Sequence, residues 1–186
     1  QDSQFHGFVA TRGARLSRIE TRAHLIGKHA DCNLHTVQLL RHDRHGDSTT
    51  EITHDTVGAT SNQHCRMILD DHANGAFQGK TTVVRDAQQT DAQQMNKNLL
   101  LSRDAHANIK PELEIYADDV KCSHGATSGE LSDMALFYLM ARGIDADTAR
   151  QLLVEAFVAE AIDEAKIDGD IKDVIRAYVQ TWMDDD

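Results

Sequence analysis

The sequence predicts a mainly β domain over residues 1–129, followed by a small helical domain over residues 130–186. In the first part, short stretches rich in Ile, Val and Thr alternate polar with apolar residues, and turn-forming residues separate them. No helical apolar stripe longer than about two turns occurs there. After Gly129 the apolar residues recur with a helical period. A chain of 186 residues fits one domain, or a sheet domain with a small appendage.

The predicted strands recur at intervals of about 10 to 18 residues. Many short strands without interleaved helices are typical of a sandwich, a barrel or a β-solenoid. The spacing favours the solenoid, although no exact repeat motif is present to decide. Turns are predicted at 45–47, 71–75 and 108–111, where Gly, Asp, Asn or Pro gather. Strands are predicted at residues 16–26, 34–39, 49–54, 64–69, 80–84, 99–102 and 112–116.

Three short helices are predicted in the C-terminal part, at residues 134–141, 146–161 and 170–183. Asp145 can cap the second helix, and Gly143 is well placed to end the first. We interpret the apolar stripes of these helices as core packing within a small helical cap. Three short helices bury little apolar area by themselves, so a surface that faces a partner is the alternative interpretation.

Composition excludes several classes of protein. The formal net charge is −11, and residues 118–186 carry 16 acids against 6 bases, so we expect no nucleic-acid partner. No apolar run approaches the roughly 20 residues of a membrane span, and the N-terminus has no signal-peptide pattern. Three cysteines are too few for a disulfide scaffold and indicate a reducing cytoplasm. The run Asp184–Asp186 is interpreted as a solvated tail, and the initial Gln suggests a fragment.

The most suggestive residues for chemistry are Cys122 and His124. In an extended strand, residues i and i+2 point to the same face, so a thiolate and an imidazole would lie about 6–7 Å apart. Both groups are good ligands for soft or borderline metals, including iron in clusters. Two ligands are too few to hold a metal, so a site would need residues from elsewhere or from a second chain. The alternative is a buried cysteine and an exposed histidine near a turn.

Other candidate residues are interpreted as structural. His42 and His45 flank a turn-like stretch where chelation is conceivable, whereas the remaining histidines lack a common ligand spacing. Cys32 and Cys65 are predicted to be small core hydrophobes. No phosphate-binding loop and no nucleophile–base pair is present. The residues themselves therefore favour a protein without catalytic residues.

One stretch is more specific. Residues 110–127, Lys-Pro-Glu-Leu-Glu-Ile-Tyr-Ala-Asp-Asp-Val-Lys-Cys-Ser-His-Gly-Ala-Thr, closely resemble the SufB/SufD family, scaffold components of the SUF iron–sulfur cluster assembly machinery. Their form is closer to the SufD branch. Residues 90–101, 137–144 and 149–160 resemble further segments of that family. Family members are much longer, so this chain resembles their C-terminal part.

The resemblance implies a right-handed parallel β-helix followed by a C-terminal helical domain. It further implies pairing of a SufB-like sibling with a SufD-like chain, or of two SufD-like chains, through the end of the β-helix. The helical domain would dock a SufC-like ATPase. Positions matching Cys122 and His124 lie near the pairing interface in the family, and the histidine position is implicated in formation of the nascent cluster.

The resulting expectation is a non-catalytic, cytoplasmic scaffold subunit that contacts neither nucleic acid nor membrane. An iron–sulfur cluster would be held transiently at the subunit interface, with Cys122 and His124 as metal ligands, and this chain alone would bind none tightly. A purely architectural module without cluster ligands is the alternative. Parallel β-helices also include polysaccharide lyases, but the sequence has no evident cluster of carboxylates and bases along a groove.

Overall fold

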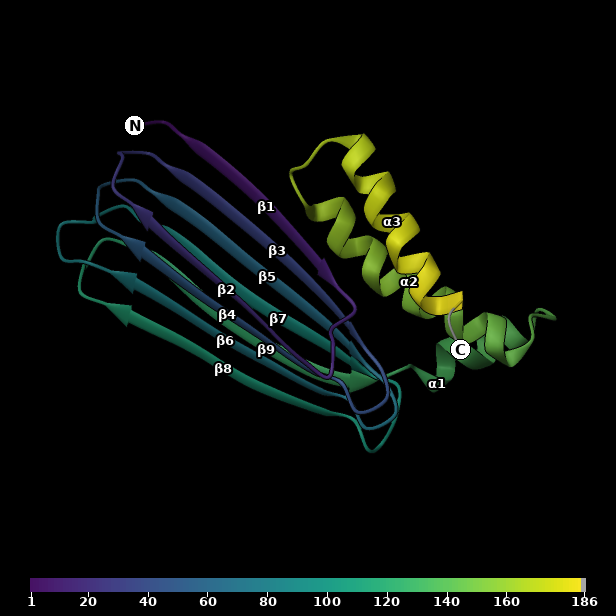
Figure 1. Cartoon of the computed structure of the whole chain (residues 1–186). Helices are drawn as coiled ribbons and strands as arrows, with labels where there is room; N and C mark the ends of the chain where they lie inside the picture. Colours follow the sequence, from purple (N-terminus) through teal and green to yellow (C-terminus); the bar gives the residue numbers. More distant parts are fainter. Residues whose placement is uncertain (185–186) are drawn as a thin grey trace.

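The chain winds into a flattened solenoid with a pair of long helices laid against one side (Figure 1). The structure is a computed structural model that describes residues 1–184, so Asp185 and Asp186 of the predicted acidic tail lie outside the described residues. Within that range the strands are β1 Gln4–Thr11, β2 Leu16–Leu25, β3 Asp31–Leu40, β4 His45–His54, β5 Thr60–Leu69, β6 Asn74–Val83, β7 Asp91–Leu100, β8 His106–Ile115 and β9 Lys121–Glu130.

The strands form two parallel sheets that face each other across the solenoid. Sheet A has the order β1-β3-β5-β7-β9, and sheet B has the order β2-β4-β6-β8. Successive turns stack in register, so that Asp31 pairs with Thr60, Thr60 with Asp91, and Asp91 with Lys121. This stacking confirms the parallel β-helix and excludes the sandwich and the barrel.

Two predicted turns were wrong. Residues 45–47 begin β4, and residues 108–111 lie inside β8. Gly46 faces the interior, where an added Cβ would come within 2.8 Å of the Leu40 Cδ1 atom, so this glycine makes room for a core leucine. Pro111 is tolerated because β8 is an edge strand, where one missing N–H need not break the ladder. Residues 4–11 form a strand that we had not predicted.

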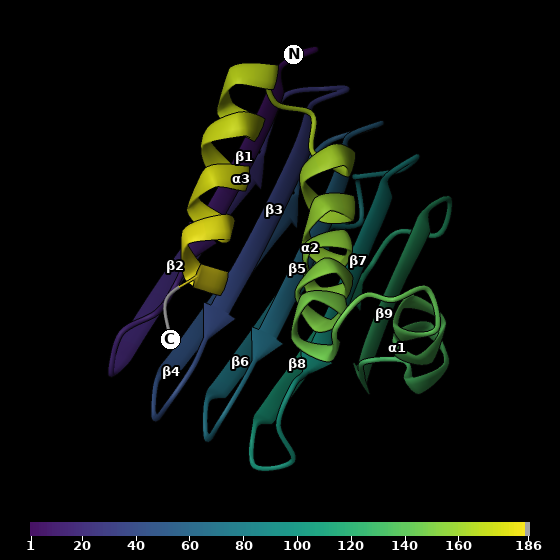
Figure 2. The same ribbon diagram turned by 90° about the vertical axis from the view of Figure 1, so that its right-hand side faces the viewer.

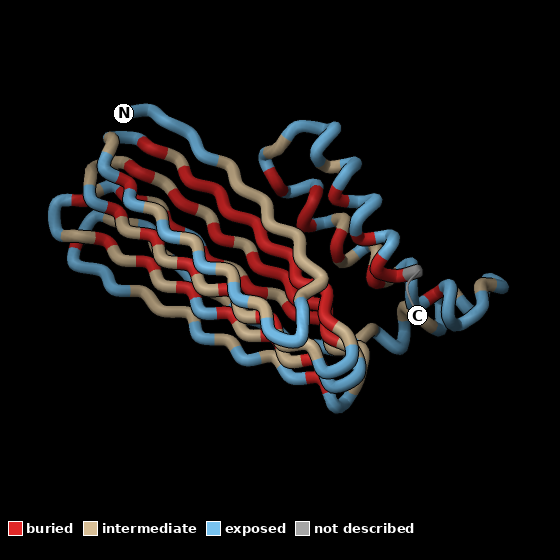
Figure 3. Tube along the Cα trace, viewed as in Figure 1, coloured by how far each residue is buried: buried red, intermediate tan, exposed pale blue. Residues whose placement is uncertain are grey.

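The interior of the solenoid is apolar at both ends of the strands and polar in the middle. Leu40, Met67 and Leu69 pack with Phe77 at one end. A second buried apolar cluster around Ile52 fills the other end. Buried amides and hydroxyls fill much of the rest, including Gln38, Thr50, Gln63, Thr81, Gln94, Asn96 and Asn98. Burial is densest in the strands at the centre of sheet A, where both faces are covered (Figure 3).

The helices are α1 Asp133–Met140, α2 Ala146–Glu164 and α3 Gly169–Asp184. The predicted cap is confirmed, because the Asp145 carboxylate accepts the Thr148 N–H at 3.0 Å. Helices α2 and α3 lie along the outer face of sheet A (Figure 2). Their stripes pack on the sheet as well as on each other, and the shared cluster comprises Val37, Leu39, Ile68, Leu99, Val154, Val158, Ala161, Ile162, Ile175, Val179, Trp182 and Met183. Among residues 1–184, no helix combines the length and apolar character that crossing a membrane requires.

The change from strand to helix falls between Glu130 and Asp133. The division of the chain into two domains at residue 129 stays a prediction, since the helices share an apolar cluster with sheet A.

Candidate functional site at the open end of the solenoid

Cys122 and His124 both lie in β9, the last strand of sheet A. They pair in register with Ala92 and Gln94 of β7, which are buried, so both face the interior side of the sheet. No further turn covers β9 within the described residues, and His124 is exposed while Cys122 is half-buried. The structure thus places the two donors on one face at the open end, and their role as ligands stays a prediction.

The Cys122 thiol packs beside the apolar cluster of Val83, Ala87 and Ala117. Burial raises the pKa of this thiol, the Asp91 carboxylate raises it further, and a hydrogen bond with the Ala92 backbone opposes the rise. At neutral pH the group is therefore a thiol. Only a bound metal or a base would convert it to the thiolate that binds iron.

Beneath His124 the interior side of sheet A carries two glutamines. Gln63, Gln94 and His124 occupy the same register position in β5, β7 and β9. Gln63 is paired on both sides, since it accepts from the Thr50 hydroxyl at 2.5 Å and donates to the Thr81 hydroxyl at 2.8 Å. Gln94 is 2% exposed, and neither of its amide atoms has a hydrogen-bond partner among the described residues.

Two donors remain too few for a mononuclear site. Within residues 1–184, no group of three or more His, Cys, Asp or Glu residues is arranged to hold a metal ion. Cys32 and Cys65 are buried core residues, as predicted, and burial raises their pKa values to about 11 and about 12. The His42 Nδ1 atom lies 2.9 Å from the Asp71 carboxylate at the surface, while His45 belongs to β4.

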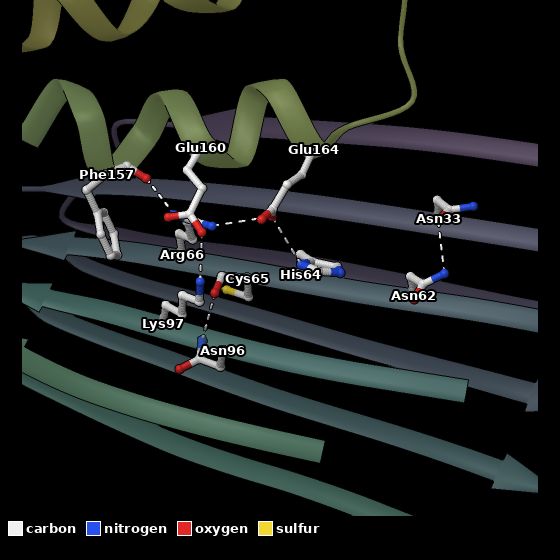
Figure 4. A network of polar contacts seen from close by, with 10 residues as sticks. All are labelled: Asn33, Asn62, His64, Cys65, Arg66, Asn96, Lys97, Phe157, Glu160 and Glu164. Atoms are coloured by element: carbon white, nitrogen blue, oxygen red, sulfur yellow. Dashed lines mark hydrogen bonds and ion pairs between the residues drawn. The ribbon is translucent and has the colours of Figure 1, made fainter. Parts of the chain in front are cut away.

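A charged cluster that we had not predicted ties α2 to sheet A (Figure 4). The Arg66 guanidinium is 2% exposed and donates to the Phe157 carbonyl at 2.7 Å and to the Glu160 carboxylate at 2.8 Å. Glu164 lies 3.3 Å from the same guanidinium, and Lys97 donates to Glu160 at 2.9 Å. Hydrogen bonds from Arg66 and Lys97 lower the pKa of Glu160 to about 2.

Every charged group in this cluster has a partner of opposite charge. The cluster therefore holds α2 against sheet A and is not interpreted as a ligand-binding site. The sequence did carry a signal for it. A charged residue stands in the middle of a predicted buried strand, and two glutamates follow each other at helical spacing on α2. What the sequence alone lacked was the pairing of these two segments, which are 94 residues apart.

Helix α1 presents an unusual apolar surface. Met134, Phe137 and Tyr138 are 81%, 72% and 55% exposed. Beside the helix is a cavity of about 410 Å³, lined by residues that include Leu136 of α1, Val154 of α2 and Leu101 of the solenoid. Large exposed apolar side chains that cluster on one element mark an interaction surface.

Comparison with known proteins gives a consistent result. The family model described as SUF system FeS cluster assembly, SufBD core domain, matches residues 1–157. The iron–sulfur cluster assembly protein SufD of Escherichia coli is 36% identical over 174 residues, which cover 94% of this chain and 40% of that protein. Protein ABCI7, chloroplastic, of Arabidopsis thaliana is 35% identical over 180 residues, which cover 96% and 38% of the two chains.

A Synechocystis protein named as an iron–sulfur cluster assembly SufBD family protein is 48% identical over 118 residues, which cover 60% of this chain and 26% of that protein. The chain therefore spans less than half the length of these relatives. The matched region includes all nine strands described here, α1 and part of α2.

Proposed function

Because the chain belongs to the SufBD family of the SUF iron–sulfur cluster assembly system, we propose that it is the C-terminal part of a non-catalytic scaffold subunit. It pairs with a SufB-like sibling, or with a second copy of itself, through β9. The observation that carries the proposal is the placement of Cys122 and His124 together on the open edge of sheet A. The cluster is the cargo of this site, and no residue here acts as a catalyst.

The two strand edges at the open end differ in a way that supports pairing through β9. Edge strand β8 carries Pro111 and the Lys110–Glu112 ion pair at 3.0 Å, and charged or proline-bearing edges resist pairing with another strand. Edge strand β9 holds no Pro, Asp, Glu, Lys or Arg between Cys122 and Gly129. The side of β9 that faces away from β7 therefore remains open to a partner strand.

Pairing would also complete the donor set. Each chain supplies one thiol and one imidazole, and iron in clusters is held by thiolates and, in some centres, imidazoles. A second chain laid against β9 brings its own donors to the same place. It also covers His124, which is exposed in the single chain. Covered donors exclude water from a nascent cluster.

The SufC-like ATPase docks, in this proposal, on the helical part. The exposed Met134 and Phe137 side chains of α1 supply an apolar surface with nothing packed over it in the described chain. Because α1 follows β9 after a short link, movement of the docked ATPase would act close to the pairing edge. We propose the cytoplasm as the compartment, since all three cysteines are free.

The test uses the full-length subunit, expressed anaerobically with its sibling and ATPase and purified as the complex. Iron and acid-labile sulfide are quantified for the wild type, Cys122→Ala and His124→Ala. Ser123→Ala is the matched control, because Ser123 lies between the two donors on the opposite face of β9. We expect either donor substitution to empty an intact complex, and the control to load normally.

If both donor variants load as the wild type does, the ligand hypothesis fails and the subunit is an architectural partner only. If the wild-type subunit binds neither protein, the proposed function itself fails.

Docking of the ATPase has a separate test. Phe137→Ser should weaken binding of the ATPase at least tenfold, measured by calorimetry on the full-length subunit. Val174→Ser is the matched control, because Val174 is 69% exposed but lies on α3. Equal affinities for the two variants would remove α1 from the docking surface.

A further inference from the structure

Helix α1 differs from α2 and α3 in how it is attached to the rest of the chain. Deepening the proposed function and resting on it for the identity of the partner, we propose that residues 132–145, which hold α1, form a lid over the cavity beside α1. When the lid closes, Asp133 pairs with Arg103 of the solenoid. Docking of the ATPase selects one position of the lid, while α2 and α3 stay fixed on sheet A.

Helices α2 and α3 are fixed to sheet A by two kinds of contact. Val158 and Ile162 of α2 and Trp182 of α3 are buried in the apolar cluster that the helices share with the sheet. Arg66 of β5, which is also buried, donates to the Glu160 carboxylate of α2 at 2.8 Å. Lifting these helices would expose the cluster and separate a buried ion pair, and both changes are costly.

Helix α1 has neither kind of contact. None of its residues is buried. Its polar side-chain contacts within the described chain are the Ser132 cap, which accepts the Ala135 N–H at 3.3 Å, and the Arg142 guanidinium over the Tyr138 ring. Both contacts lie inside residues 132–145, so they hold the lid together and do not tie it to the solenoid. A segment with few buried contacts opens at low cost in free energy.

The two ends of the lid provide pivots. Before it, Leu131 packs against the apolar cluster of sheet A and the helices, and after it α2 joins the same cluster at Val154. Between these anchors α1 lies past the end of β9 (Figure 1). Gly143 follows α1 with a φ of 88°, and no atom outside its neighbours lies within 4 Å of an added Cβ. A glycine in open space can absorb a change in backbone direction.

The cavity gives the lid room to close. It has a volume of about 410 Å³, and its lining includes Leu136 of α1, Leu101 of the solenoid and Val154 of α2. Protein interiors contain few voids larger than a water molecule, so α1 is not closely packed on the body in this position. Movement of α1 into the cavity would bring these apolar side chains together and remove their surface from water.

Opposite charges line the two sides of the cavity. Arg103 belongs to the corner between β7 and β8, and Asp133 is the first residue of α1. Both are exposed, and neither forms an ion pair within residues 1–184. Of the charged residues described in the lining, only Asp133 belongs to the lid. Closure would bring the two groups together, and an exposed pair of this kind shifts an equilibrium by up to about fivefold.

The position of the lid matters for assembly because the lid follows β9. The exposed Met134 and Phe137 side chains, on which the ATPase is proposed to dock, both belong to the lid. An ATPase that binds one lid position more tightly shifts the equilibrium toward it by that difference in affinity. The shift then acts on the end of β9 through Leu131, without any movement of α2 or α3.

The experiment uses the full-length subunit, with spin labels attached to a ketone-bearing amino acid so that the native cysteines stay unchanged. Pulsed electron spin resonance measures the distance from Gln78, exposed on sheet B, to Met140 on the lid. The distance from Gln78 to Ala156, exposed on α2, is the control. Both distances are measured in the free subunit and after addition of the ATPase.

Two kinds of variant are compared. Arg103→Glu breaks the proposed pair, and the same change combined with Asp133→Arg restores it with the charges exchanged. Leu101→Trp fills the cavity and so prevents closure. Leu16→Trp is its matched control, because Leu16 is 72% exposed on β2 and does not line the cavity. Arg103 is exposed, so its variants carry the test if Leu101→Trp does not fold.

We expect two Met140–Gln78 distances in the free subunit and one Ala156–Gln78 distance. Leu101→Trp should remove one Met140 population, which identifies the closed lid, whereas Leu16→Trp should behave as the wild type does. Arg103→Glu should lower the ratio of closed to open lid at least twofold, and the charge exchange should restore it. Addition of the ATPase should leave one Met140–Gln78 distance.

A single Met140–Gln78 distance that no variant changes would overturn the proposal. Equal shifts of Met140 and Ala156 would also overturn it, because the helical part would then move as one body. Two lid positions in a subunit that does not bind the ATPase would support the lid and refute the proposed docking. Binding of the ATPase with an unchanged distribution of Met140–Gln78 distances would refute the lid and leave the docking standing.

Discussion

Strands β5 and β9 belong to the same parallel sheet and differ in almost everything else. Strand β5 lies at the centre, with the solenoid interior on one face and α2 on the other, and its charged residue Arg66 is fully paired. Strand β9 lies at the edge, most of its residues are exposed, and His124 has no covering strand within residues 1–184. One sheet therefore separates the groups that stabilise the fold from those available for chemistry.

The difference teaches how to assign buried and exposed polar residues in a solenoid. A charge inside the stack must be neutralised within the chain, because desolvation otherwise costs several kcal/mol. A metal-binding side chain on the last strand has no such desolvation cost until a partner strand covers it. Changes on β5 should therefore alter folding, and changes on β9 should alter assembly.

The largest effect is expected at β5. Arg66→Met removes the guanidinium that joins Glu160, Glu164 and the Phe157 carbonyl, and should lower the free energy of unfolding by roughly 3 kcal/mol. Urea unfolding followed by circular dichroism measures it. The control is Arg176→Met, which breaks a pair with Asp163 on the exposed helix surface and should cost less than about 1 kcal/mol. Equal losses of unfolding free energy in the two variants would contradict the distinction between the buried and the exposed ion pair.

A smaller effect, on assembly instead of folding, is expected at β9. Thr127→Lys places a charge on the exposed edge strand and should weaken pairing with the sibling at least tenfold, about 1.4 kcal/mol. The free energy of unfolding should change by no more than about 0.5 kcal/mol. Analytical ultracentrifugation of full-length subunits measures the pairing. Thr82→Lys, on the outer face of sheet B, is the control and should pair normally.

The third effect concerns pH and is expected at β3, next to β5. His35 is stacked between Phe8 and His64, and burial, aided by the positive charges of His64 and Arg66, lowers its pKa to about 4. The His35 imidazole takes up a proton near pH 6.5 in the unfolded chain but only near pH 4 in the folded chain. Stability contributed by the neutral ring is therefore present above pH 6.5 and is lost as the pH falls toward 4.

His35→Phe should reduce this loss, because phenylalanine keeps the stack with Phe8 and cannot be protonated. Urea unfolding at pH 7 and pH 4.5 checks it, and each pKa unit of depression corresponds to about 1.4 kcal/mol. Some dependence of stability on pH should remain in this variant, since burial also lowers the pKa of His54 to about 4. If His35→Phe lost as much stability between pH 7 and pH 4.5 as the wild type does, the assignment of this pH dependence to His35 would be contradicted.

The positions of strands and helices could be predicted from the sequence better than their arrangement in space. Alternation located most strands, and the apolar stripes located the three helices. The choice among sandwich, barrel and solenoid could not be made from the pattern, because the stacking of one turn on the next is a relation between distant residues. Glycine and proline misled us at Gly46 and Pro111, where they serve an interior close approach and an edge strand.

The features of the candidate site also differ in whether they could be predicted from the sequence. Cys122 and His124 could be paired from the sequence, since two residues apart in a strand share a face. That their shared face is the interior side of sheet A could not be predicted, because it depends on their register with Ala92 and Gln94 of β7. The Arg66 cluster required knowledge of which helix lies on which strand.

Amide hydrogen exchange tests the central claim most directly, by comparing the full-length subunit alone with the same subunit paired with its sibling. A partner strand laid on β9 must bond the backbone groups that point away from β7, so the alternate β9 amides on that side between Cys122 and Gly129 should gain strong protection. The amides of β8 should be unchanged, and those of β5 should exchange slowly in both states. Protection gained on β8 and absent from β9 would contradict the account.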